Sequence, residues 1–121
     1  MTNLDALIFG NMISKIKSDD RKLPVKLSLA LNRNEARLKN DVIGPFARVL
    51  EDRGWGKVNL YTMEGLADEG EKEELAQLCA AEANIELATV EEEDILAADL
   101  TINEVSAIMA YMLDSKEVQN G

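Results

Sequence analysis

Apolar residues recur every three or four positions over most of the chain, which is the spacing of an amphipathic helix. The pattern predicts a first helix over residues 3–17, with Thr2 as its N-cap and Asp5 completing a capping box. After a polar break, Pro24 suits the first turn of a second, longer helix that runs to about residue 52. The first half of the chain is therefore expected to consist of two helices.

The second predicted helix carries a broad apolar face with two irregular points. Asn34 lies in that face, so it needs a hydrogen-bond partner if it is buried. Further on, Gly44 and Pro45 should kink or split the helix, because proline removes one helical hydrogen bond. Gly54 and Gly56 then mark its end, since glycine commonly follows the last turn of a helix.

The middle of the chain contains two stretches that alternate like short strands. Residues 57–61 and 84–90 show this alternation and contain residues that favour β structure. A third helix is predicted between them, capped by Thr62 or Asp68 and ending near residue 82. The two stretches are expected to form a minor β element.

A second capping box, Thr101 with Glu104, predicts the start of the last helix. Residues 115–121 are expected to be a disordered tail. The expected fold class is mostly α: a single small helical domain over residues 1–114, with a minor two-stranded β element and one long helix interrupted by proline.

The first helix is apolar on nearly all sides, so nearly all of its surface must be buried against other elements. Either other helices of the same chain or the neighbouring subunit of an oligomer could bury it. Methionines in the last helix would add adaptable apolar surface, and we expect self-association through the first and last helices. The candidate interface residues are Leu4, Ile8, Phe9, Met12, Ile108, Met109 and Met112.

Charge divides the chain into two unequal halves. Residues 1–57 hold eleven Lys and Arg against seven acids, a net of +4, whereas residues 58–121 hold two against sixteen, a net of −14. The total of −10 argues against general nucleic-acid binding, because phosphates need a cationic surface. The second helix nevertheless carries a cationic stripe beside its apolar face. Its members are Lys22, Lys26, Arg33, Arg37 and Arg48, of which the first four are candidate ligand-binding residues.

Composition excludes several kinds of catalytic chemistry. The chain has no histidine and one cysteine, so it lacks imidazole catalysis, a His-ligated zinc site and any Cys-pair metal cluster. Cys79 lies on the apolar side of the third predicted helix, where a packed thiol is expected rather than a nucleophile. The contiguous acids at residues 91–94 would point in several directions instead of converging on one ion. We therefore predict no catalytic residue, no metal site and no cofactor, and a protein that acts by binding.

Three kinds of binding fit the sequence. The first is interaction with another protein, in which apolar helices supply buried area and opposite charges set the register. The second is an oligomeric binder of a phosphate-bearing small molecule or nucleotide, held by the cationic stripe. The third is a DNA mimic, in which the acidic half occupies the nucleic-acid groove of another protein.

KLPVKL at residues 22–27 opens the long helix, Glu74-Leu75 closes a charged stretch, and LTINE at residues 100–104 precedes the last helix. In these three strings the chain resembles short phage-encoded proteins of unknown function found among siphovirus genes. The resemblance implies a phage or prophage origin and an accessory role, in which the protein binds a host or phage protein as an inhibitor or in assembly. It carries over no catalytic or ligand residue.

The expected location is the cytoplasm of the bacterial host. No run of about 18 apolar residues is present to cross a bilayer. The first ten residues also lack the basic start of a secretory signal. A membrane partner is therefore not expected.

Overall fold

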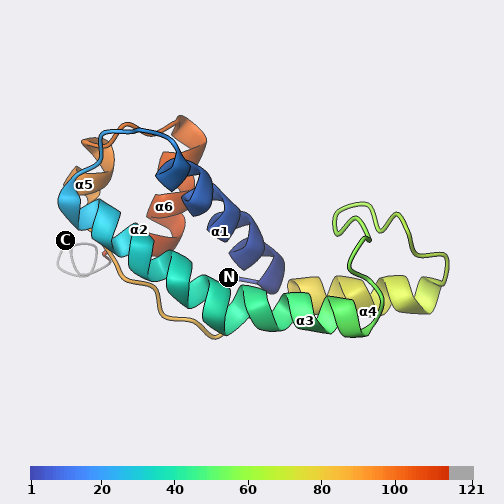
Figure 1. Cartoon of the computed structure of the whole chain (residues 1–121). Coiled ribbons are helices and arrows are strands. Elements are labelled where there is room, and N and C mark those ends of the chain that lie inside the picture. The colour runs from blue at the N-terminus through green and yellow to red at the C-terminus, as the bar shows by residue number, and fades with distance from the viewer. Residues whose placement is uncertain (115–121) are drawn as a thin grey trace.

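The computed structural model describes residues 1–114, and they fold mainly into helices (Figure 1). In chain order these are α1 (Asn3–Ser18), α2 (Val25–Leu38), the π-helix η1 (Lys39–Ile43), α3 (Gly44–Asp52), α4 (Glu69–Ala80), α5 (Glu92–Leu96) and α6 (Ile102–Met112). The mostly α-helical class that the sequence predicts is confirmed. The predicted disordered tail lies outside the described residues.

Three of the helices begin at side-chain caps. The Thr2 hydroxyl accepts the Asp5 N–H at 3.0 Å, and the Asp5 carboxylate accepts the Thr2 N–H at 3.0 Å. Thr101 and Glu104 make the same exchange at the start of α6, at 3.2 and 2.8 Å. Asp68 caps α4 through the backbone N–H two residues later. Both predicted capping boxes are confirmed, so local sequence decides where these helices begin.

The helices α2, η1 and α3 join into one long rod that is interrupted near Pro45 (Figure 1). The turn before the proline widens to a π turn, in which the Gly44 N–H donates to the carbonyl of Lys39, five residues back. Pro45 then lies in the first turn of α3, directly after this wide turn. The predicted interruption is thus a wide turn rather than a gap.

This π turn leads us to expect that Gly44→Ala will destabilise the protein. A Cβ at Gly44 would lie 2.7 Å from the backbone oxygen of Lys39, and such overpacking costs about 1–3 kcal/mol. The control is Gly70→Ala in α4, where the nearest atom would be 3.5 Å away and alanine should stabilise the helix by roughly 0.5–1 kcal/mol. Urea denaturation measures both effects. Equal stabilisation of the two variants would contradict the prediction.

Buried side chains form two separate clusters. The larger one lies between α1, α2, α5 and α6, with Phe9, Ile13 and Leu31 essentially inaccessible to solvent. The smaller one lies at the other end of the rod and contains Phe46, Trp55, Leu75 and Cys79. Cys79 is 5% exposed, so the predicted packed position is confirmed, and burial raises the pKa of its thiol.

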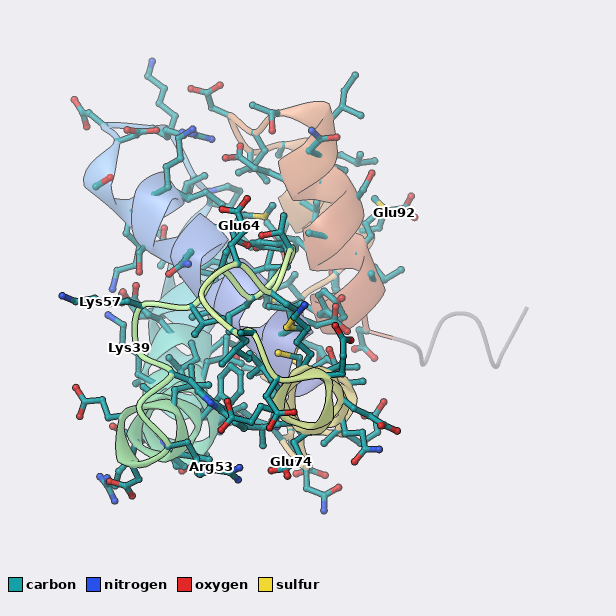
Figure 2. All side chains as sticks on the ribbon, turned by 90° about the vertical axis from the view of Figure 1, so that its right-hand side faces the viewer. Lys39, Arg53, Lys57, Glu64, Glu74 and Glu92 are labelled. Atoms are coloured by element: carbon teal, nitrogen blue, oxygen red, sulfur yellow. The ribbon has the colours of Figure 1, made fainter. Side chains whose placement is uncertain are left out.

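Figure 2 views the smaller cluster along α3 and α4, with Arg53 just after the end of α3 and Glu74 in the middle of α4. The Arg53 guanidinium lies 4.3 Å from the centre of the Trp55 ring and forms an ion pair with Glu74. The guanidinium therefore covers the ring and links it to α4.

The two predicted strands do not pair, and no sheet forms within residues 1–114. Residues 57–61 are turns, so their prediction as a strand is wrong. Residues 84–90 are extended along α2 (Figure 1), but isolated bridges occur only at Glu82 with Thr2 and at Val90 with Leu113. The predicted two-stranded β element is therefore not formed.

Candidate functional site

The predicted cationic stripe lies beside the acidic part of the chain. Lys26, Arg33 and Arg37 are exposed on α2, and Lys22 is exposed just before it. The Arg37 guanidinium donates to the backbone carbonyl of Glu86 at 3.0 Å. The stripe therefore faces the −14 half of the molecule rather than open solvent alone.

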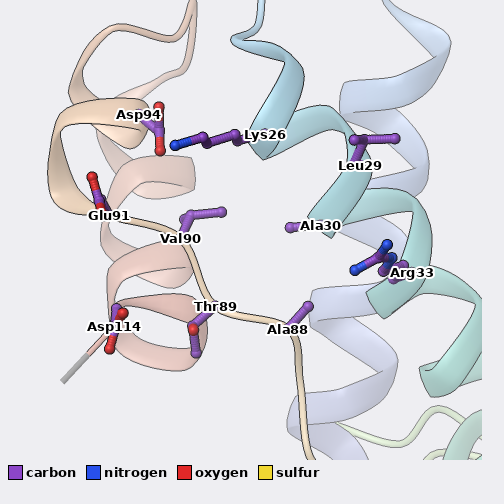
Figure 3. Close-up of a pocket in the computed structure, with 10 residues that line it drawn as sticks. All are labelled: Lys26, Leu29, Ala30, Arg33, Ala88, Thr89, Val90, Glu91, Asp94 and Asp114. Carbon is purple, nitrogen blue, oxygen red and sulfur yellow. The ribbon is translucent and has the colours of Figure 1, made fainter. Parts of the chain in front are cut away.

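Lys26 and Arg33 line one side of a cavity of about 310 Å³ (Figure 3). The other side carries three carboxyl groups, from Glu91, Asp94 and Asp114. Figure 3 shows the Lys26 ammonium pointing towards Asp94. Because carboxylates outnumber cations here, an anionic ligand would meet repulsion as well as attraction.

The acids beside this cavity are crowded. The pKa of the Glu93 carboxyl is raised, first by its hydrogen bond with Glu91 and then by the charges of Glu91 and Asp94. The charge of Lys26 acts in the opposite direction. Lys26 thus offsets part of the repulsion among these acids.

Asn34 is fully buried and has the partner that its position requires. Its side-chain amide donates to the Ala88 carbonyl at 3.0 Å, and its side-chain oxygen accepts the Ala88 N–H at 2.7 Å. One asparagine therefore pairs with both polar groups of a residue 54 positions away. The prediction that Asn34 needs a hydrogen-bond partner is confirmed.

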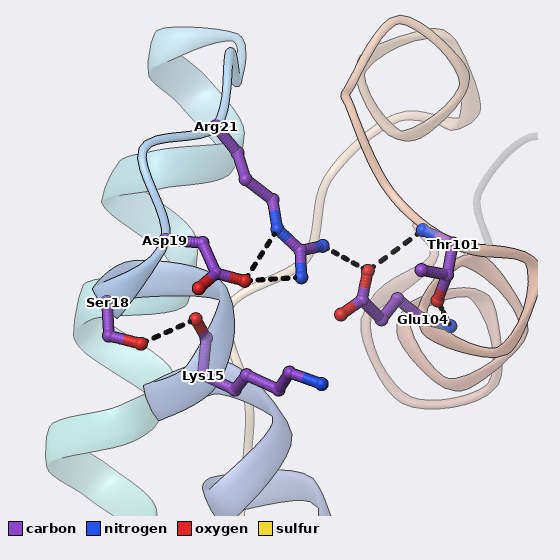
Figure 4. Close-up of polar contacts among 6 residues, drawn as sticks. All are labelled: Lys15, Ser18, Asp19, Arg21, Thr101 and Glu104. Carbon is purple, nitrogen blue, oxygen red and sulfur yellow. Dashed lines mark hydrogen bonds and ion pairs between the residues drawn. The ribbon is translucent and has the colours of Figure 1, made fainter.

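Arg21 connects the α1–α2 linker to the start of α6 (Figure 4). Its guanidinium donates to the Asp19 carboxylate at 2.8 Å and also to Glu104. Burial alone would raise the pKa of Glu104, but the hydrogen bonds from Arg21 and Thr101 outweigh burial and lower it. Glu104 is therefore both a helix cap and the buried end of a charge network.

The candidate interface residues fall into three groups by their burial in the structure. Phe9, Ile108 and Met112 are at most 1% exposed and belong to the chain's own larger cluster. Met12 and Met109 pack against that cluster and Leu4 against the smaller one, all three half-buried. Of these seven residues only Ile8 is exposed, with 41% of its surface accessible to solvent. The same chain therefore supplies most of the cover that α1 requires.

An apolar groove remains between α1 and α6, with a volume of about 280 Å³. We call it the α1–α6 groove. The Phe9 and Tyr111 rings meet in it, with centroids 5.0 Å apart and planes tilted by 55°. Its lining residues are Asp5, Ile8, Phe9, Met12, Ser106, Ala107, Ala110 and Tyr111. The groove brings together three of the predicted interface residues of α1, but none of those predicted on α6.

Ala107, Ala110 and Tyr111 line the α6 side of the groove together with Ser106, and none of them is among the interface residues predicted from the sequence. Their spacing of three and four residues places them on one helical face. The alanines are small, so they leave the hollow that bulkier residues would fill. A search for small residues at helical spacing next to an aromatic could have found this face.

No helix within residues 1–114 combines the length and the apolar character needed to span a bilayer. The same residues contain no group of three or more His, Cys, Asp or Glu arranged to hold a metal ion. Comparisons with protein-family models, curated proteins and solved structures found no significant match. The resemblance to phage-encoded proteins stays a prediction from sequence.

Proposed function

We propose that this protein is a non-enzymatic phage accessory protein that acts by binding another protein, of the host or of the phage. The observation that supports the proposal most directly is the open α1–α6 groove, with apolar walls and Ile8 at 41% exposure. A partner side chain seated there would touch Phe9 and Tyr111 and complete the burial of Ile8. The groove belongs to two well-packed helices, so little ordering is needed before binding.

The groove also offers the surface for self-association. Completing the burial of one isoleucine contributes about 1 kcal/mol, so a stable complex needs contacts beyond the groove itself. Ala107 and Ala110 allow a partner backbone or a large side chain to approach α6 closely. A second copy or a different protein would use the same face.

We expect Ala110→Arg to abolish binding by filling the groove. Ala110 is exposed, so arginine can be accommodated without disturbing the core. The measurement combines light scattering of the purified chain with affinity capture from a bacterial lysate, followed by mass spectrometry. A partner or oligomer that forms with the wild type and is lost with Ala110→Arg supports the proposal.

The matched control is Ala47→Arg, which makes the same change at an exposed alanine of α3 outside the groove. It should leave both the oligomeric state and the captured proteins unchanged. A complex that persists in Ala110→Arg would place the interface elsewhere and overturn the proposed site. A wild-type chain that is monomeric and captures nothing specific would overturn the function.

The nucleotide hypothesis is weaker than protein binding on this geometry. The cavity that contains Lys26 and Arg33 also contains three carboxyl groups, and Arg37 is engaged by the backbone of Glu86. The acidic segment next to α2 also faces cations, which removes part of the continuous negative surface that a DNA mimic needs. Protein binding is therefore the function that this geometry favours.

A further inference from the structure

Residues 83–90 form an extended segment that is fixed at both ends. The Ala83 N–H donates to the carbonyl of Met1 at 3.0 Å, and the Val90 N–H donates to the carbonyl of Met112 at 2.8 Å. Between these points the segment runs beside α2 at the lower border of Figure 1, and at Val90 it meets the chain at the C-terminal end of α6, to which both Val90 backbone groups are bonded. Its conformation is therefore set before any partner arrives.

Between its fixed ends, the backbone hydrogen bonds that the structure describes for the segment all run to side chains of α2. Ala88 exchanges two hydrogen bonds with Asn34, and the carbonyl of Glu86 accepts one from Arg37. Asn34 precedes Arg37 on α2 while Ala88 follows Glu86, so the segment runs antiparallel to the helix. The backbone groups of Glu86 and Ala88 thus point towards α2.

The backbone groups of alternate residues point to opposite sides of an extended chain. Those of Ile85, Leu87 and Thr89 consequently point away from α2. Within residues 1–114, no hydrogen bond engages the backbone of these three residues. The result is an open strand edge, which can pair with another extended chain.

The sequence of this segment is that of a strand without a partner strand in the described chain. Ile85, Thr89 and Val90 favour β structure, and the alternation that predicts a strand is present. Edge strands are usually protected by proline, lysine or a bulge. Residues 84–90 contain neither proline nor lysine, and their one charge is Glu86.

Charge indicates which kind of chain would pair with this edge. The segment is flanked by Glu82 on one side and by Glu91 and Glu92 on the other, with Glu86 within it. Antiparallel pairing of two copies centred on Leu87 would bring the two Glu86 side chains diagonally together, and like charges across a strand pair are destabilising. A basic strand avoids this cost.

We infer that the outer edge of residues 84–90 receives an extended, basic segment of a partner protein by β-strand addition. Ile85, Leu87 and Thr89 supply the backbone hydrogen bonds, and Glu86 pairs with a lysine or arginine of the added strand. The cations of α2 lie on the opposite side of the segment, where Arg37 binds Glu86 through its carbonyl. The edge shares no residue with the α1–α6 groove, so the two surfaces can be tested separately.

The probe is a blocked heptapeptide of alternating lysine and valine, titrated into the isotope-labelled full chain and followed by NMR. Hydrogen exchange at the Ile85, Leu87 and Thr89 amides is expected to slow in the complex. A peptide in which proline replaces the valines should give no protection, because it cannot form the ladder. Unprotected amides at saturating lysine–valine peptide would overturn the inference.

Two variants with the same charge change test the recognition by Glu86. Glu86→Lys should weaken peptide binding roughly fivefold, as expected for losing a cross-strand ion pair and gaining a like-charge contact. Glu51→Lys on α3 is the control and should have a much smaller effect, since Glu51 is exposed and lies outside the segment. Equal weakening by both variants would mean general electrostatic attraction and would overturn the recognition by Glu86.

Protection of the Ile85, Leu87 and Thr89 amides that rises with protein concentration, without peptide, would identify a second copy as the occupant. That result would also overturn the inference.

Discussion

Asn34→Asp is expected to lower the free energy of unfolding by about 3 kcal/mol, a large part of the stability of a domain this size. The Asn34 amide donates to the Ala88 carbonyl, which an ionised carboxylate cannot do and would instead repel. The site is fully buried, so the new charge would also lose its hydration. Urea denaturation followed by circular dichroism at neutral pH measures the loss.

The control for this change is Asn32→Asp, on the same helix and with the same charge difference. Asn32 is exposed, so its replacement should alter stability by no more than about 0.5 kcal/mol. Exchange of the Ala88 amide gives a local measurement, because its N–H bonds to Asn34 at 2.7 Å in the wild type. A similar loss of stability in both variants would show that added charge, rather than the pairing with Ala88, is responsible.

Asn34 also shows how far sequence reasoning reaches in this protein. The helical pattern places Asn34 on an apolar face, and from that the need for a partner follows. The partner is the backbone of Ala88. Because every residue has the same backbone groups, the identity of residue 88 does not indicate that it pairs with Asn34. Capping boxes are predictable because both members lie within four residues, whereas this pairing depends on how distant segments pack.

The failed strand at residues 57–61 has a local cause that outweighs β propensity. The side-chain oxygen of Asn59 accepts hydrogen bonds from the N–H groups of Tyr61 and Thr62. These two bonds stabilise a turn directly after Asn59. Gly65 adopts a φ of 105° and comes close to Val58, and this closes the loop. Turn chemistry within a few residues therefore decides the conformation.

The apolar first helix illustrates a different limit. Its pattern predicts that nearly every side is covered but not which chain provides the cover. The structure places Phe9, Ile108 and Met112 in the chain's own core, while Ile8 stays exposed. Helical periodicity cannot separate these cases, because a side chain buried by its own chain and one buried by a partner have the same spacing.

Trp55→Ala is expected to cost about 4 kcal/mol, with the effect concentrated in the smaller cluster. Trp55 is 3% exposed and packs with Phe46 and Leu75. Its removal leaves a large cavity and also takes away the ring on which Arg53 lies. Because this cluster is separate from the larger one, the loss should appear first as local opening of α4 and the loop before it.

Native-state hydrogen exchange distinguishes local opening from global destabilisation. In Trp55→Ala the amides of α4 should exchange much faster, while those in the middle of α1 and α2 change less. Trp55→Phe keeps an aromatic ring and should retain most of the protection. Tyr61→Ala alters the same loop at a residue that is 70% exposed, so it should change little. An equal loss of protection in α1, α4 and α6 would contradict this prediction, because it would mean that the two clusters unfold as one cooperative unit.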